Sequence, residues 1–215
     1  MSKTQPEPIR DPATDHLLTP ENCAVVLIDY QPEQYRTVTS STREEIDLNV
    51  IALCKLAVAY DVPVIVSTVG VDMGVNTGTA EEILAELPGV NEIDRTGVNA
   101  WEDEEFRKAV EATGRKNIVM AGLWTEVCLT FPTLDMQAEG YHVYPVADAV
   151  GGVSPVAHEQ ALDRMRQAGA TPITAIQFGS ELMRNWARES SDKFRKVLQW
   201  YFPKRFGLLK EGKIG

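Results

Sequence analysis

The chain has 215 residues, of which 44% are hydrophobic, and this suits one globular domain with a full core. Its formal net charge of -10 makes a partner that is DNA, RNA or an anionic membrane unexpected. Because it has no apolar run long enough to span a bilayer and no signal-peptide core at its start, we expect a cytoplasmic protein.

After a polar, proline-containing arm at residues 1–20, which we expect to be flexible, strands and helices alternate. Strands are predicted where β-branched and other apolar residues run together, and helices where apolar residues recur with a helical period. Capping boxes that start at Ser41 and Thr79 open the first two helices. The predicted strands are 23–30, 62–69, 91–95, 117–122, 142–148 and 171–176. The predicted helices are about 41–60, 79–87, 102–114, 128–140, 155–169 and 177–186.

Strict alternation of this kind predicts an α/β fold with a central parallel sheet of about six strands and helices on both faces. We assign residues 21–190 to this domain. Residues 191–215 place basic side chains among aromatic ones. In a chain this acidic, we expect this tail to be a strap over the domain or a contact with an oligomer partner, and not a nucleic-acid site.

Three polar residues lie where predicted strands end. Asp29 closes the first strand, Arg95 closes the third, and Cys128 follows the fourth. Ligands of open α/β sheets bind beyond the carboxyl ends of the strands, where the strand order reverses. If the order is the common 3-2-1-4-5-6, strands one and four are neighbours at that point. We then expect Asp29 and Cys128 to face one crevice.

Each of these residues also has an ordinary structural interpretation. Asp29 suits a loop cap, Arg95 a surface cation, and Cys128 a small buried hydrophobe, as we expect for Cys23 and Cys54. Cys128, however, is predicted near a helix N-terminus, where free N–H groups and the helix dipole stabilise a thiolate. The three side chains together suggest a nucleophile, a base and an electrostatic partner.

The segments around these residues resemble a known family. An Asp that closes VVLIDYQ, a basic residue before GVNAW and a Cys within AGLWTEVCLTFPTLDMQAEGY resemble the isochorismatase-like cysteine hydrolases, and among them the YcaC-related branch. The stretches VADAVGG and ALDRMRQAGA extend the resemblance to about residues 19–186. The motif AG-x-x-T-E-V-C is its specific part.

This resemblance implies a three-layer α/β/α, Rossmann-like fold and hydrolysis of a C–N bond in a small amide through a thioester on Cys128. It implies a triad of Asp29, Arg95 and Cys128. The wider family has Lys where this chain has Arg95. Arginine stays charged and presents a planar fork, so Arg95 is expected to hold a Cys128 thiolate and orient Asp29 without shuttling a proton.

The resemblance also implies a cis peptide at Trp124–Thr125 and an oxyanion hole made by the backbone N–H groups of Thr125 and Cys128. Asn99, Trp101, Trp124 and Phe131 flank the triad in sequence, and we predict that they line the substrate pocket. Trp101 and Phe131 suit core packing equally well.

Neither a metal nor a cofactor is predicted. Metal-bearing relatives carry an Asp-x-His arrangement beyond the second strand, whereas this chain has Asp72 there without a histidine. The cysteines form no zinc-like cluster. We do not expect His16, His142 or His158 near the crevice, which disfavours a Cys-His mechanism.

Three functions remain open at this stage. The first is a cysteine amidohydrolase that acts on a small molecule. The second is a thiol-redox protein that uses Cys128, although no resolving cysteine lies nearby in sequence. The third is a catalytically weak or inactive oligomeric homologue, because a fold does not guarantee a function. The resemblance to the YcaC-related branch implies a homo-oligomer, such as an octamer.

Overall fold

The computed structural model describes residues 4–215, so the first three residues of the predicted arm lie outside the described residues. At its centre is a parallel five-stranded sheet with the order β3-β2-β1-β4-β5. The strands are β1 (Cys23–Ile28), β2 (Val64–Val69), β3 (Glu92–Arg95), β4 (Asn117–Gly122) and β5 (His142–Pro145). Strand order reverses between β1 and β4, which places the switch point between these two strands.

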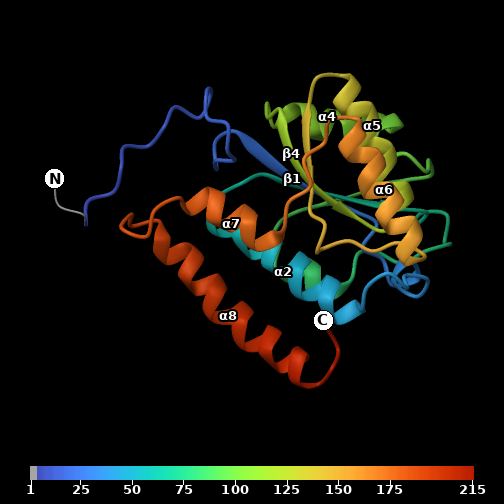
Figure 1. Cartoon of the computed structure of the whole chain (residues 1–215). Coiled ribbons are helices and arrows are strands. Elements are labelled where there is room, and N and C mark those ends of the chain that lie inside the picture. The colour runs from blue at the N-terminus through green and yellow to red at the C-terminus, as the bar shows by residue number, and fades with distance from the viewer. Residues whose placement is uncertain (1–3) are drawn as a thin grey trace.

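Helices cover both faces of this sheet, which confirms the predicted α/β/α fold (Figure 1). One face carries α4 (Glu104–Ala112), α5 (Thr130–Ala138) and α6 (Pro155–Gln167). The other carries α2 (Arg43–Ala59) and α7 (Ala175–Met183), with α8 (Ser191–Lys210) packed outside them. Short helical turns in the connections are α1 (Pro32–Tyr35), α3 (Glu81–Leu84), η1 (Ala100–Glu102) and the π-helical η2 (Thr125–Leu129).

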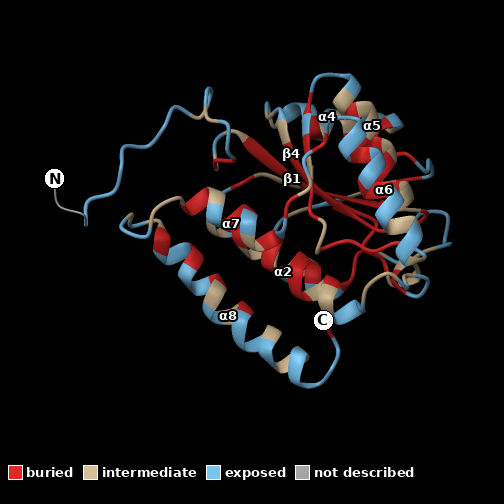
Figure 2. Cartoon of the chain, in the orientation of Figure 1, coloured by how far each residue is buried: buried red, intermediate tan, exposed pale blue. Residues whose placement is uncertain are grey.

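The core lies along the central strands. All six residues of β1 are buried, because β1 has a strand on each side and helices over both faces. This is why its sequence reads as an unbroken apolar run instead of alternating. Figure 2 shows the same pattern, with buried residues along the sheet and on the inner sides of α2 and α7, and exposed residues on the outer side of α8.

The predicted sixth strand is the main difference from the expected topology. Within 171–176, Ile173 forms a single bridge with Val146 and the Thr171 N–H donates to the Val143 carbonyl, before the chain turns into α7 at Ala175. The segment still runs beside β5 but is too short to form a ladder.

The capping boxes predicted for the first two helices also differ. Helix α2 is capped by Thr42, whose side chain accepts the N–H of Glu45, one residue later than the predicted box at Ser41. Helix α3 follows Ala80, which has no capping group, so Thr79 does not cap it.

The C-terminal segment forms α8 and packs on α2 and α7. Its inner side buries Phe194 and Tyr201, and the Tyr201 hydroxyl donates to Asn49 of α2 at 2.8 Å. Its outer side exposes Phe202 and Phe206, whose rings stack with centroids 6.0 Å apart. The helix therefore straps the domain on one side and presents aromatic rings on the other.

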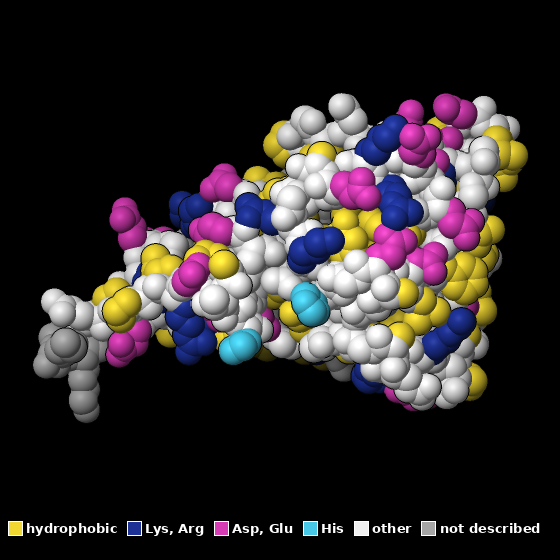
Figure 3. All heavy atoms as spheres, turned by 90° about the horizontal axis from the view of Figure 1, so that it is seen from above, with side chains coloured by type: hydrophobic (Ala, Val, Ile, Leu, Met, Phe, Trp, Pro, Cys, Tyr) yellow, Lys and Arg dark blue, Asp and Glu magenta, His cyan; other side chains and the backbone are white. Residues whose placement is uncertain are grey.

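The face seen in Figure 3 mixes both signs of charge. Figure 3 looks onto the side that carries α4, α5 and α6, and there Lys and Arg side chains lie among Asp and Glu side chains. Such a mixed face lacks the single-sign field that binds nucleic acid. Across residues 4–215, none of the helices is both long enough and apolar enough to cross a membrane.

Candidate active site

The carboxyl edge of the sheet brings Asp29, Arg95 and Cys128 together. Strands β1 and β4 pair in register up to Ile28 and Gly122, so the residues that follow them emerge side by side. Arg95 ends β3, which is separated from β1 by β2. Its long side chain therefore crosses the end of β2 to reach the carboxylate of Asp29.

Asp29 and Arg95 form a buried, two-pronged ion pair. The Nη1 and Nη2 atoms of Arg95 donate to Oδ1 and Oδ2 of Asp29, each at 2.7 Å, and both side chains are fully buried. Nη1 also donates to the Ser67 hydroxyl at 3.1 Å and to the Thr68 carbonyl at 3.0 Å, both on β2. The carboxylate is thus held by a fork that is itself fixed to the sheet.

The same pair keeps Arg95 charged. Burial alone lowers the pKa of the guanidinium, but its hydrogen bonds to Asp29 and the charge of that carboxylate outweigh burial and raise the pKa. Two of its nitrogens are committed to Asp29. Arg95 consequently acts on Cys128 through its charge and through the carboxylate that it fixes in place.

Cys128 lies in η2, where burial and the neighbouring Asp29 oppose ionisation of its thiol. Burial raises the pKa of Cys128 well above its ordinary value, and the charge and hydrogen bond of Asp29 raise it further. The charge of Arg95 and a hydrogen bond from the Trp124 N–H lower it, but by less. Burial and a neighbouring carboxylate thus oppose the resting thiolate expected from the helix terminus.

The predicted oxyanion donor at Thr125 is also wrong. The N–H of Thr125 already donates to the Gly151 carbonyl at 3.0 Å. The cis peptide is Leu123–Trp124, one residue before the predicted position. Since the N–H of Trp124 is the group hydrogen-bonded to the Cys128 sulfur, Trp124 replaces Thr125 as the candidate donor.

Two of the four predicted pocket residues have structural roles. Trp101 is 2% exposed and packs edge-on against Phe106 and Tyr141, with centroids 6.5 and 5.2 Å away. The side chain of Asn99 caps η1 by accepting the Trp101 N–H, and it donates to Asp135 at 2.7 Å. The structure thus places Trp101 in the core, and Asn99 in contacts that hold η1 against α5.

Trp124 and Phe131 lie near Cys128 in sequence and are half-buried. The indole Nε1 of Trp124 donates to the Thr37 hydroxyl at 2.8 Å and to the Gln34 carbonyl at 3.2 Å. This contact ties the segment after α1 to the start of η2. Phe131 sits on the first turn of α5, three residues beyond Cys128. Both rings remain candidates for lining a substrate pocket.

His158 lies against the nucleophile turn, contrary to the expectation that no histidine would. Its Nδ1 is 2.9 Å from the hydroxyl of Thr125. The two residues are 33 positions apart in sequence. No local pattern pointed to the contact, because it depends on how α6 packs on η2.

The loop after β2 is held by a carboxylate from β3. Asp94 accepts the N–H groups of Val71 and Asp72 at 3.1 and 2.9 Å and the Thr68 hydroxyl at 3.0 Å. Burial is the largest single contribution and opposes ionisation, but these hydrogen bonds together outweigh it and lower the pKa of Asp94. In the described part of the chain, no group of three or more His, Cys, Asp or Glu side chains is placed to hold a metal ion.

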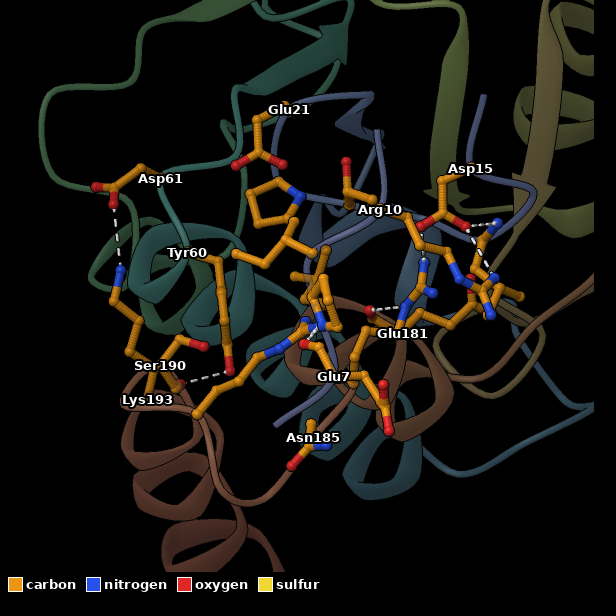
Figure 4. A pocket seen from close by; sticks show the side chains of 18 residues that line it. Glu7, Arg10, Asp15, Glu21, Tyr60, Asp61, Glu181, Asn185, Ser190 and Lys193 are labelled. Carbon is orange, nitrogen blue, oxygen red and sulfur yellow. Dashed lines mark hydrogen bonds and ion pairs between the residues drawn. The ribbon is translucent and has the colours of Figure 1, made fainter. Parts of the chain in front are cut away.

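A cavity of about 540 Å³ lies at the opposite edge of the sheet (Figure 4). Its walls come from the N-terminal arm, the end of α2 and the junction between α7 and α8. Charged side chains in it pair with one another, as Arg184 does with Asp15 at 3.0 Å and Lys193 with Asp61 at 3.3 Å. Since it adjoins the amino ends of β1 and β2, this cavity is separate from the triad.

The chain is similar to a known family and to a known protein. The family model described as Isochorismatase domain matches residues 23–177. The Escherichia coli (strain K12) protein named "Probable hydrolase YcaC" is 37% identical over 173 residues, 80% of this chain and 83% of that protein.

Two solved structures are also similar to this chain. One is YcaC from Pseudomonas aeruginosa with hexane-2,5-diol and covalent acrylamide, at TM-score 0.84 and 35% identity, covering 92% of this chain and 98% of that chain. The other is YcaC from Escherichia coli, described as an octameric hydrolase of unknown specificity. Its TM-score is 0.83 and its identity 34%, and 92% of this chain and 96% of that chain are covered.

Proposed function

The chain belongs to the isochorismatase family, and on that basis we propose that it hydrolyses a C–N bond of a small amide with Cys128 as the nucleophile. The observation that carries the proposal is the buried sequence of contacts from Arg95 to Asp29 to the Cys128 thiol. A fixed carboxylate beside a protonated thiol is a base placed to take the thiol proton during attack.

In the first half of the reaction, the Cys128 sulfur attacks the amide carbonyl carbon while Asp29 takes the thiol proton. The carbonyl electron pair moves onto oxygen, where the backbone N–H groups of Trp124 and Cys128 stabilise the oxyanion. The intermediate then collapses, the C–N bond breaks, and Asp29 gives its proton to the leaving amine. The product of this half is a thioester on Cys128.

In the second half, Asp29 takes a proton from water as the water oxygen attacks the thioester carbon. The C–S bond breaks, the thiol recovers its proton, and a carboxylic acid leaves. Arg95 keeps its proton throughout, since a guanidinium does not give it up in proteins. Its part is to hold both oxygens of Asp29 and to offset the negative charge that builds up beside them.

One relative carries a covalently bound amide. The Pseudomonas aeruginosa protein holds covalent acrylamide, a small amide with an electrophilic double bond. In this chain Cys128 is 7% exposed, whereas Cys23 and Cys54 are fully buried. Cys128 is therefore the thiol that we expect acrylamide to modify here.

The raised pKa of the Cys128 thiol counts against the thiol-redox alternative. Redox-sensing cysteines ionise easily and are accessible to solvent. We also propose a homo-oligomer, because the full-length relative from Escherichia coli is octameric. Light scattering coupled to gel filtration measures the assembly directly.

The experiment that tests this function is turnover of a panel of small primary amides by the parent protein, Cys128→Ala and Asp29→Asn, followed by release of ammonia. We expect turnover by the parent and none by Cys128→Ala. A parent protein that acrylamide labels at Cys128 but that turns over no amide would favour the inactive-homologue alternative.

A further inference from the structure

The turn that carries Cys128 is anchored to α6 through Thr125. This residue is fully buried, and its hydroxyl lies 2.9 Å from Nδ1 of His158. Its N–H donates to Gly151, and its carbonyl accepts the Thr130 hydroxyl at 2.6 Å. Both backbone polar groups of Thr125, the first residue of η2, are thus paired. The contact between its hydroxyl and the His158 imidazole links η2 to the neighbouring helix α6.

A second contact fixes the same turn. The Oε1 atom of Glu126 accepts the Val153 N–H at 2.9 Å, while Oε2 is buried and has no partner among the described residues. A Cβ added to Gly152 would lie 2.5 Å from that Oε2 and 3.1 Å from the backbone nitrogen of His158. Gly152 therefore leaves room for Glu126 and the backbone of His158 where a Cβ would otherwise stand.

The surroundings of the His158 ring favour its neutral form. Burial lowers its pKa, the charges of Glu126 and Glu159 raise it by less, and Arg166 lowers it slightly. A neutral imidazole carries one donor and one acceptor nitrogen, so either tautomer bonds the Thr125 hydroxyl. The contact therefore holds without a change in charge.

We propose that His158 is a positioning residue for the nucleophile turn: through Thr125 it fixes the start of η2 and so keeps the Trp124 N–H aimed at the Cys128 sulfur. The ring touches neither the thiol nor the proposed substrate. The inference rests on the proposed function in one respect, namely that the Trp124 N–H stabilises an oxyanion. Loosening the turn should then slow attack on a carbonyl more than simple displacement at an alkyl carbon.

Two electrophiles separate these effects. Cys128 attacks p-nitrophenyl acetate at its carbonyl, forming a thioester and releasing p-nitrophenolate, and so needs the oxyanion donor. It attacks iodoacetamide at an alkyl carbon, releasing iodide, and this reaction does not need the oxyanion donor. In His158→Leu we expect acylation to slow about tenfold, the equivalent of one lost hydrogen bond, while alkylation slows by less, since the Trp124 N–H also helps to lower the pKa of the thiol.

His158→Asn is the conservative variant, because its amide group sits near the place of Nδ1, and it should acylate at close to the parent rate. His142→Leu, on the exposed start of β5, is the matched control for the substitution itself. Thermal unfolding of each variant verifies that it is folded. Equal slowing with both electrophiles, or slowing with neither, would overturn the proposal.

A parent protein that p-nitrophenyl acetate does not acylate would count against the proposed function and not against this contact. Hydrogen exchange of the peptide 124–130, followed by mass spectrometry, then decides. We expect His158→Leu to exchange faster there than the parent and His158→Asn to resemble it. Unchanged exchange in His158→Leu would refute the positioning role by itself.

Discussion

Replacing Arg95 by Met removes the cation of the buried pair and leaves the carboxylate of Asp29 without its partner. Both side chains are fully buried and share two hydrogen bonds of 2.7 Å. Breaking a buried pair by removing one member costs about 3–5 kcal/mol of stability. We expect Arg95→Met to fall in this range, and Asp29→Asn combined with Arg95→Met to recover part of the loss.

The assay is urea unfolding followed by circular dichroism. Arg166→Met is the matched control, because Arg166 pairs with Asp163 at 2.6 Å on the surface, where both side chains are about half exposed. A surface change of this kind alters stability by no more than about 0.5 kcal/mol. If Arg95→Met costs no more than Arg166→Met, the carboxylate is not held in a buried pair, and the proposed fixed base is refuted.

Three further predictions concern the thiol, its base and a second carboxyl. Iodoacetamide labelling of Cys128 should keep accelerating as pH rises past 9, because the pKa of its thiol is raised; a rate already at its plateau at neutral pH would contradict this. In Asp29→Asn the same profile should move to lower pH, since the charge of Asp29 and its hydrogen bond are among the causes that raise that pKa; a shift to higher pH would refute the contact. Burial raises the pKa of Asp148 from 3.8 to about 6, so between these values the native state binds more protons than the unfolded state. Stability should therefore fall by about 1–3 kcal/mol as pH rises through this window, and Asp148→Asn should remove that fall in unfolding curves measured at pH 4 and 7.

The sheet and the meeting of its polar ends could be predicted because they depend on patterns within short windows. The unbroken apolar run of β1 required a strand covered on both faces, and all six of its residues are buried. The rule that ligands bind at the switch point then put Asp29 and Cys128 at one edge. The placement of Arg95 near Asp29 depended on the assumed strand order. In the observed order β3-β2-β1-β4-β5, β2 lies between the strand that ends at Arg95 and the strand that precedes Asp29.

The details of the site depend on tertiary contacts that no short window contains. Trp101 suited a pocket and a core equally well, and only its packing against Phe106 and Tyr141 distinguishes them. The sequence alone allows the N–H of Thr125 to be an oxyanion donor, but in the fold this N–H donates to the Gly151 carbonyl. Isomerism at Leu123–Trp124 involves no proline and leaves no mark in the sequence.

Arginine in the place of lysine changes how the proposed nucleophile is activated. The fork of Arg95 occupies both oxygens of Asp29 and retains its proton, so in the proposed mechanism Asp29 acts as the acid and base. Burial and Asp29 both oppose ionisation of the thiol before a substrate arrives. The thiol proton then has to be transferred during the attack. This transfer becomes favourable when the negative charge moves onto a substrate oxygen that faces the Trp124 N–H. Such a thiol should discriminate against alkylating agents and oxidants, which offer no such oxygen, and in favour of carbonyl compounds small enough to reach a buried sulfur.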